Sequence, residues 1–149
     1  MRIDFEYVDL KDHRTLEEIV RFCLDAGLSG EGDYESKIVS AVIIRDGKGI
    51  AATSRLEMIF DRPFVEGVAV RDDLRGKGLG RKIVEEMIAK AKNLNYRRVW
   101  IAARAPEFFK KLGFISNNDE ELGALVMNSC RKCNQYLKEC NPEILMMDP

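Results

Sequence analysis

The chain has 149 residues, of which 46% are hydrophobic and 33% are charged. This length favours a single domain over residues 1–149 with its own hydrophobic core. Lys and Arg number 24 and Asp and Glu number 25, so the formal net charge is -1, which disfavours a protein that binds nucleic acid through bulk positive charge. No apolar run approaches the roughly 18 residues that span a bilayer, and the N-terminus lacks the apolar region of a signal peptide. We therefore expect a cytoplasmic protein that binds neither nucleic acid nor membranes.

The first half of the chain predicts a strand, a helix and a β-hairpin. Thr15 followed three residues later by Glu18 is typical of a capping box that opens a helix, and Gly27 is a typical helix stop. Asp46-Gly47 is a strong hairpin turn sequence. The strands are predicted over residues 3–8, 38–45 and 49–60.

The second half begins with a run that is almost entirely apolar, residues 64–70, which follows a break at Arg62-Pro63. Such a run predicts a central strand covered on both faces. The remaining predicted elements are a Gly-rich connection at 71–80, a helix to Asn93, a strand at 98–102, a helix from Pro106 to about Gly113, and strands at 114–116 and 122–127. The hairpins imply antiparallel pairs and the strand–helix–strand unit a parallel pair, so the fold class is mixed α/β (α+β).

The Gly-rich connection has the features of an anion-binding site. Glycines allow a ligand to approach the backbone closely, and the first N–H groups of the following helix have no partner within that helix. Residues 71–82 include five Lys and Arg residues and two Asp residues, which gives this segment a surplus of three positive charges. The P-loop spacing G-x-x-x-x-G-K-[ST] is absent. The dinucleotide-binding fingerprint G-x-G-x-x-G, counted from Gly76, requires a glycine at its sixth position, where this chain has Arg81.

Two segments resemble landmarks of the GNAT family of N-acetyltransferases. One is Arg75-Gly76-Lys77-Gly78-Leu79-Gly80-Arg81, four residues after Val68-Ala69-Val70, which is similar to the R/Q-x-x-G-x-G/A signature. The other is the aromatic pair Phe108-Phe109 followed by Lys-Leu-Gly-Phe. The resemblance covers about residues 1–127. It implies a mixed, mostly antiparallel sheet of six to seven strands flanked by helices.

The resemblance also implies acetyl transfer from acetyl-CoA, as co-substrate, to a primary amine. The amides of residues 75–81 would hold the pyrophosphate, and the edge of the strand at Val68, Ala69 and Val70 would lie beside the pantetheine arm. Ala105, Phe108 and Phe109 would flank the thiol end. A monomer or a homodimer is expected.

Glu66 is the candidate catalytic residue. A carboxylate within an apolar strand is costly unless it is paired or functional, and burial raises its pKa toward the range of a general base. The resemblance implies that such a Glu removes a proton or anchors the ammonium, and that a backbone N–H of residues 68–70 polarises the carbonyl. Phe109 stands where many members carry a Tyr that acts as general acid. Tyr96, Tyr136 or water are the alternatives.

The Cys-containing C-terminal segment, residues 128–149, holds Cys130, Cys133 and Cys140. Two thiols at this spacing form half of a typical zinc site, but three ligands fall short of the usual four. We therefore favour no metal and three reduced thiols on a helical tail. The Cys-rich end and Ala-Pro-Glu-Phe-Phe at 105–109 resemble, more weakly, N-acetylglutamate-synthase-like members of the family.

That weaker resemblance implies a small amino-acid-like acceptor, which requires a cation in the pocket for the α-carboxylate. A protein amine is an alternative acceptor, and it predicts an open groove beside Glu66 where a small acceptor predicts a closed pocket. A CoA-binding regulatory module without catalysis is a further alternative. Elsewhere, Cys23 on the apolar stripe of the first helix is predicted to be a core thiol, and His13 a surface or capping residue.

Overall fold

Seven strands form one mixed sheet in the computed structural model, which describes residues 3–28, 35–132, 137 and 142–149. The strand order is β1-β2-β3-β4-β5-β7-β6, and within these residues only the β4–β5 pair is parallel. The elements are β1 (Phe5–Tyr7), α1 (His13–Asp25), β2 (Ser36–Asp46), β3 (Gly49–Ile59), β4 (Arg62–Val70), the 3-10 helix η1 (Asp72–Leu74), α2 (Leu79–Asn93), β5 (Val99–Ala103), α3 (Pro106–Lys111), β6 (Ile115–Ser116), α4 (Glu120–Lys132) and β7 (Glu143–Met147). This architecture confirms the predicted fold class.

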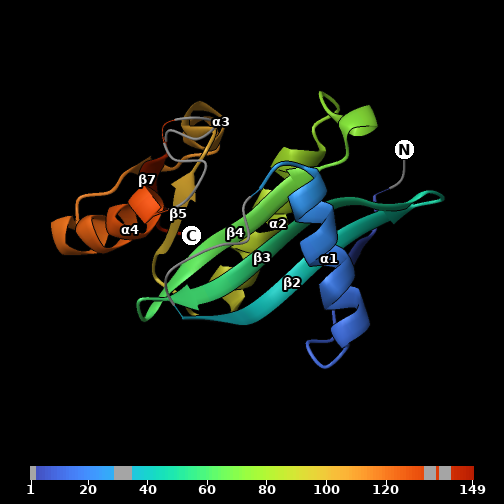
Figure 1. Ribbon diagram of the computed structural model, residues 1–149, viewed down its shortest axis with the longest axis horizontal. Coiled ribbons are helices and arrows are strands. Elements are labelled where there is room, and N and C mark those ends of the chain that lie inside the picture. Colours follow the sequence, from blue (N-terminus) through green and yellow to red (C-terminus); the bar gives the residue numbers. More distant parts are fainter. Residues whose placement is uncertain (1–2, 29–34, 133–136, 138–141) are drawn as a thin grey trace.

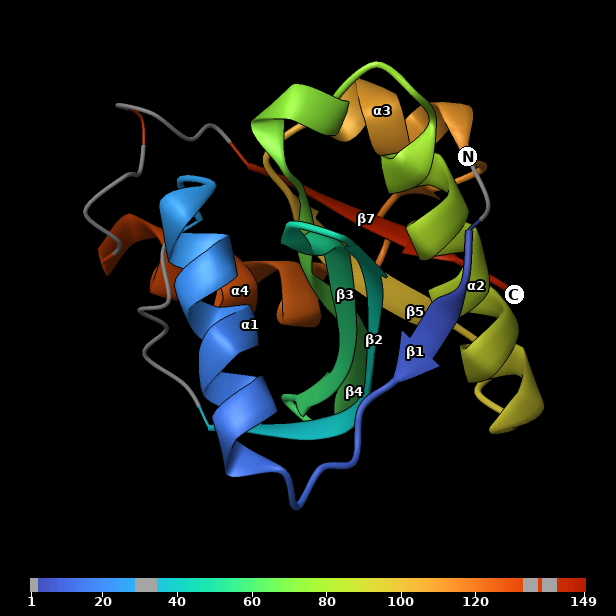
Figure 2. The same ribbon diagram turned by 90° about the vertical axis from the view of Figure 1, so that its right-hand side faces the viewer.

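The helices cover the two faces of the sheet (Figure 2). On one face α2 packs on the sheet together with Phe109 and Phe114, around the fully buried Ile83 and Met87. On the other face α1 and α4 form two separate apolar clusters, around Ile19 and around Val126 respectively. The strands β2, β3, β4 and β5 therefore contribute most of the buried core.

Strands β4 and β5 are joined at one register position. Phe64 pairs with Trp100, and their rings stack with centroids 6.4 Å apart. Beyond this pair the two strands separate, as the V between them in Figure 1 shows. The inner edge of β4 after Phe64 therefore has no neighbouring strand among the described residues.

A β-bulge lies in β4 directly after Glu66. Thr53 and Arg55 are two residues apart in β3, whereas their partners Ala69 and Glu66 are three apart in β4. The extra residue falls at Gly67, whose φ of 61° lies in the left-handed region that glycine adopts without strain. The bulge bends β4 at the point where it leaves β5.

Two boundaries differ from the prediction. Helix α1 begins at His13, because the carboxylate of Asp12 accepts the backbone N–H of Thr15 (3.1 Å) and its hydroxyl (2.6 Å). Asp12 is therefore the N-cap instead of Thr15. The break before β4 falls on Phe60 and Asp61, which both have positive φ, and Arg62 already belongs to the strand.

The strand predicted over residues 122–127 is wrong, because this segment lies within α4. Asp119 accepts the N–H of Leu122 through its side chain (3.0 Å), and the buried residues Leu122, Val126 and Ser129 recur at helical spacing. The missing strand is β7, between β5 and β6 in the sheet. The segment 128–149 thus contributes a helix end and an internal strand. Cys133, Tyr136 and Cys140 lie outside the described residues.

No helix in the described part of the chain is long and apolar enough to cross a membrane.

We expect β7 to be essential for the stability of the sheet. Leu145 is fully buried between β5 and β6, so Leu145→Ala should lower the free energy of unfolding by about 2–5 kcal/mol. Leu125→Ala, on the exposed side of α4, should lower it by less than about 1 kcal/mol. Urea unfolding followed by circular dichroism measures both. Equal losses would contradict the placement of β7.

Candidate active site

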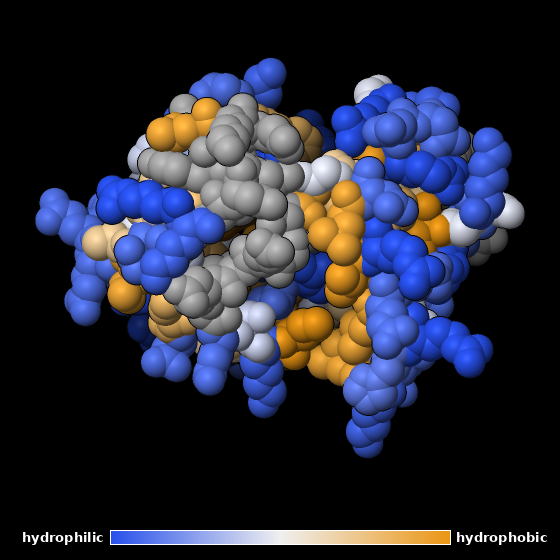
Figure 3. Space-filling view, in the orientation of Figure 1, coloured by the Kyte–Doolittle hydropathy of each residue, from blue (hydrophilic) through white to orange (hydrophobic). Residues whose placement is uncertain are grey.

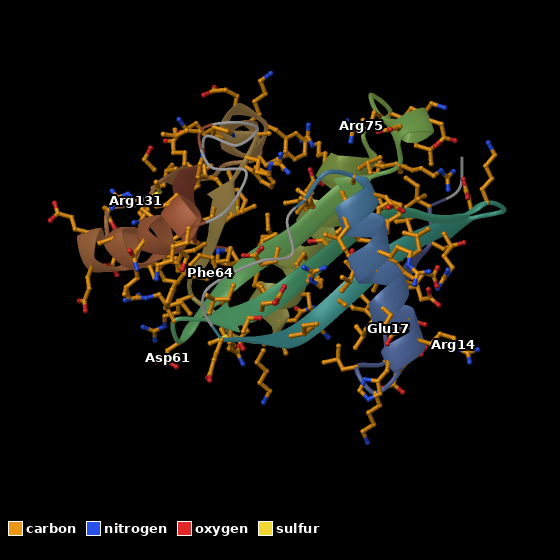
Figure 4. All side chains as sticks on the ribbon, in the orientation of Figure 1. Arg14, Glu17, Asp61, Phe64, Arg75 and Arg131 are labelled. Carbon is orange, nitrogen blue, oxygen red and sulfur yellow. The ribbon has the colours of Figure 1, made fainter. Side chains whose placement is uncertain are left out.

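A cavity of about 900 Å³ lies between the separating strands β4 and β5. One end is lined by the glycine loop after β4, defined here as residues 71–80, and by α3, and the other end by α1 and α4. Figure 3 shows apolar side chains gathered in the hollow between the two halves of the molecule. In Figure 4 Phe64 lies where β4 and β5 are paired and Arg75 lies at the opposite end, in the glycine loop. The V of the sheet therefore forms an elongated site.

The glycine loop ends on the N-terminus of α2. Gly76 and Gly78 have φ of 78° and 81°, and Gly78 is the N-cap without a capping side chain. The first helical bond runs from Lys82 N–H to Gly78 O. The N–H groups of Leu79, Gly80 and Arg81 therefore have no partner within the helix, and these three residues line the cavity. Amides in this position suit a diphosphate.

Acidic partners hold several of the cations around the loop. The Arg71 guanidinium forms ion pairs with Asp46 and Asp73 and lowers the pKa of the Asp46 carboxyl to about 2. Arg75 pairs with Asp72 at 3.2 Å and Arg81 with Glu85 at 2.6 Å. The pairs of Arg75 and Arg81 are exposed, so a ligand phosphate could replace their carboxylates at little cost.

Lys77 is exposed in the loop and, unlike the other predicted loop residues, does not line the cavity. The predicted residues that do line it are Glu66, Val68, Ala69, Val70, Arg75, Gly76, Gly78, Leu79, Gly80, Arg81, Ala105, Phe108 and Phe109.

The inner edge of β4 presents backbone polar groups to the cavity. Arg71 N–H donates to Ala51 O in β3 at 2.9 Å. Because N–H directions alternate along a strand, the N–H of Val70, and by the same alternation that of Val68, points away from β3. Both residues line the cavity, where a ligand could accept these bonds.

The residues expected at the thiol end lie on α3 and its N-cap. Phe109 is 6% exposed and belongs to the core under α2, while Phe108 packs edge-on against it with centroids 4.9 Å apart. No tyrosine is among the lining residues that the structure describes. Tyr96 packs against the core cluster of α2 instead, and Tyr136 lies outside the described residues. The structure thus offers no described tyrosine as general acid.

Glu66 lies on β4 at the bulge and is partly buried. Burial and, to a smaller extent, the nearby Glu57 carboxylate raise the pKa of its carboxyl from 4.5 to about 7, against the lowering effect of Arg55. A carboxyl with a pKa near neutrality can accept a proton at physiological pH and release it again.

The group of side chains beside Glu66 was not predicted from the sequence. Arg55 on β3 pairs with Glu66 across the ladder and also lines the cavity. Its Nε donates to Glu57 Oε2 at 2.9 Å, and the two side chains are 17% and 9% exposed. Two charged residues spaced two apart in an otherwise buried strand are the sequence pattern that could have revealed this group.

The thiol of Cys23 completes this group. Cys23 is 5% exposed, as predicted for a core thiol, and its Sγ lies 3.5 Å from Thr53 Oγ1 and 3.7 Å from Arg55 Nη1. Thr53 donates to Gly67 O at 2.7 Å and so holds the bulge. The described residues contain no group of three metal-binding side chains. Cys130 lines the cavity, while Cys133 and Cys140, which would complete the disfavoured zinc site, lie outside the described residues.

The chain matches known proteins in sequence pattern and in fold. The acetyltransferase (GNAT) family profile matches residues 8–114. N-acetylglutamate synthase from Neisseria gonorrhoeae, solved with coenzyme A and N-acetyl-glutamate, is 15% identical with a TM-score of 0.71 over 99% of this chain and 35% of the synthase. This chain thus spans about a third of the synthase.

Two further structures match over nearly their whole length. Escherichia coli ElaA is 13% identical, with a TM-score of 0.70 over 98% of this chain and all of ElaA (100%). An acyl-CoA N-acyltransferase from Pseudomonas aeruginosa is 16% identical, with a TM-score of 0.62 over 97% and 99% of the two chains. At these identities the likeness is one of fold.

We predict that Gly80→Val weakens coenzyme A binding at least 10-fold. A Cβ at Gly80 would lie 3.3 Å from Phe108 Cζ, and a branched side chain would fill the approach to the first amides of α2. Isothermal titration calorimetry with coenzyme A measures the effect. Gly47→Val, in the open β2–β3 turn, is the matched control and should bind like the wild type. Unchanged binding by Gly80→Val would contradict the placement of the ligand.

A second prediction concerns Glu66 and the pH dependence of stability. Because its pKa is raised in the folded state, its stabilising contribution is complete below about pH 4.5 and is lost as the pH rises through 7. Relative to wild type, Glu66→Gln should therefore gain roughly 1–3 kcal/mol of unfolding free energy between pH 4.5 and 8. Glu17→Gln, at an exposed position of α1 (Figure 4), should show no such gain. A parallel pH profile for Glu66→Gln and wild type would refute the raised pKa.

Proposed function

This chain belongs to the GNAT acetyltransferase family, and from that premise we propose that it acetylates the primary amine of a small amino-acid-like molecule. The family makes it an acetyl-CoA-dependent N-acetyltransferase. The observation that carries the proposal is the shared cavity, in which the unpartnered amides at the start of α2 and the Glu66 carboxyl lie at successive positions along β4 and the loop that follows it.

Binding of acetyl-CoA follows from the geometry of the cavity. The diphosphate would accept hydrogen bonds from the N–H groups of Leu79, Gly80 and Arg81. The pantetheine arm would pair with the inner edge of β4 in place of a strand, and Val70 N–H or Val68 N–H would polarise the thioester carbonyl. The acetyl group would then lie beside the bulge that carries Glu66.

Glu66 would act as the general base. Its carboxylate accepts a proton from the acceptor ammonium, directly or through one water, and the neutral amine attacks the thioester carbonyl. The tetrahedral intermediate then expels the thiolate of coenzyme A and loses a proton from nitrogen, which yields the amide. Of the two protons released, one protonates the thiolate and the other leaves to solvent. Water is the proton donor that fits a cavity whose described lining has no tyrosine.

The acceptor end of the cavity supports a small substrate. It is walled by Val20 and Leu24 of α1 on one side and by Val126 and Cys130 of α4 on the other. An amino-acid-like acceptor also requires a cation for its carboxylate, and Arg55 supplies one beside Glu66. The likeness in fold to a synthase solved with N-acetyl-glutamate agrees with such an acceptor.

An acceptor screen tests the proposal. Release of the coenzyme A thiol is followed with free amino acids, simple amines and peptides with free N-termini or lysines. Turnover with free amino acids or amines supports the proposal, and turnover confined to peptides would show that the acceptor is a protein. The absence of thiol release with every amine would overturn the function itself.

We predict that Glu66→Gln lowers kcat by about 10²–10⁴-fold while the Kd for coenzyme A changes by less than about threefold. In the wild type, log(kcat/KM) should rise with pH up to about 7 and then level off, because the carboxylate is the active form. The variant should lack this inflection. Glu17→Gln serves again as the exposed control. An unaltered rate for Glu66→Gln would remove the carboxyl from the mechanism.

A further inference from the structure

We propose that the acceptor is an α-amino acid with an apolar side chain and that Arg55 binds its carboxylate. This inference rests on the proposed function and narrows its substrate class. It assigns to Arg55 a role as a specificity-determining residue that contacts the substrate.

The guanidinium of Arg55 is fixed beside Glu66 from three sides. Nε donates to Glu57 at 2.9 Å, and Nη1 lies 3.7 Å from Cys23 Sγ. The group also lies flat against the β-bulge, since a Cβ added to Gly67 would be 2.8 Å from both Cζ and Nη1. A side chain at position 67 would displace the guanidinium, so Gly67 serves both the bulge and the seat of Arg55.

One part of the guanidinium is left for a ligand. Within the described residues Nη2 has no hydrogen-bond partner, and Glu57 contacts the group through Nε alone. Arg55 is largely buried yet lines the cavity. A substrate carboxylate would supply the missing acceptor, and a carboxylate–guanidinium pair out of bulk water is strong and directional.

The spacing of Arg55 and Glu66 fits an α-amino acid. The two residues are direct partners across the β3–β4 ladder, and the Cβ atoms of such partners are about 4.5–5.5 Å apart on the same face of the sheet. An α-amino acid carries its ammonium and carboxylate on one carbon. It could therefore place the ammonium on Glu66 and the carboxylate on Arg55 at the same time. A simple amine would satisfy only Glu66.

The charges of Arg55, Glu57 and Glu66 suit a substrate that is a zwitterion. Arg55 carries one positive charge, and Glu57 and Glu66 carry two negative charges when both are ionised. The ammonium of the substrate would offset the charge of Glu66, and its carboxylate would lie against the only member of the trio that attracts it. Glu57 holds Arg55 in place for this contact.

The wall beyond Glu66 selects an apolar side chain. On the side away from the glycine loop, large apolar residues form most of the described lining, beside Cys23, Ser129 and Cys130. Two of these apolar residues, Val20 and Leu24, are about half exposed. The large apolar residues are Val20, Leu24, Ile59, Phe60, Phe64 and Val126. Among the described lining residues, the other cation near this end is Arg104, which donates to the carbonyl of Gly27. A second carboxylate, as in glutamate, would therefore meet apolar surface and lose its hydration without compensation.

The test compares substrates that differ by one group. Steady-state thiol release is measured with L-leucine and L-phenylalanine, with 3-methylbutylamine and 2-phenylethylamine, which lack the carboxylate, and with L-glutamate. We expect kcat/KM of the wild type to be at least 10-fold higher for the apolar amino acids than for either other class. This comparison needs no variant. Equal or higher kcat/KM for the amines or for L-glutamate would overturn the inference, while their turnover would leave acetyl transfer to small amines intact.

A variant then assigns the contact. Arg55→Gln should lower kcat/KM for L-leucine about 10- to 100-fold and for 3-methylbutylamine less than threefold, measured at a pH where both proteins have reached their plateau. Arg55→Lys should retain part of the preference. Arg45→Gln, whose ion pairs with Glu6 and Glu18 lie outside the cavity, is the matched control. Equal losses for both substrates in Arg55→Gln with coenzyme A binding retained would overturn the role of Arg55.

Discussion

The site depends on a single constraint in the sheet, the parallel pairing of β4 and β5 at one register position. The stacked rings of Phe64 and Trp100 join the two strands at one end, and nothing in the described chain pairs with the inner edge of β4 beyond it. Backbone N–H and C=O groups that have no strand partner must bond to water or to a ligand. An extended ligand chain can therefore take the place that a strand occupies elsewhere in the sheet. The bulge at Gly67 lies within this open edge, and the glycine loop follows its far end.

Buried charge is concentrated at the point where the edge opens. Arg55, Glu57 and Glu66 lie on adjacent strands, where desolvation disfavours every ionised form. The Arg55–Glu57 pair satisfies two of these charges, and Glu66 remains with a pKa near 7. Such a group is costly for stability and useful for proton transfer.

The parts of the molecule that the sequence predicted well are those set by local patterns. The glycine loop, the helix after it and the Asp46-Gly47 hairpin depend on neighbouring residues, and all three lie where expected. Helix α4 was misread as a strand because residues 122–127 are almost all apolar, and a short apolar run does not distinguish a strand from a buried helix segment. The Asp119 cap that marks the start of the helix was overlooked. Strand β7 was missed because five residues become a strand only when β5 and β6 flank them. Long-range pairing of this kind leaves no local trace.

The same distinction holds for the candidate site. Glu66 and the loop residues stand out within their own segments, and all of them except Lys77 line one cavity. Arg55 does not stand out, because its relation to Glu66 arises from the β3–β4 register and from a bulge that shifts it. A single sequence specifies strand register only weakly at a bulge. The register of β3 and β4 is what places Arg55 beside the Glu66 carboxyl.

Amide hydrogen exchange resolved by NMR tests the central claim most directly. With acetyl-CoA bound, the amides of Val68 and Val70 should exchange at least 10-fold more slowly than in the ligand-free protein, because the ligand accepts their hydrogen bonds. The amide of Ala69, which the strand alternation directs toward β3, should be protected in both states. Unchanged exchange at Val68 and Val70 in protein saturated with acetyl-CoA would contradict the account that the open edge of β4 is the binding surface.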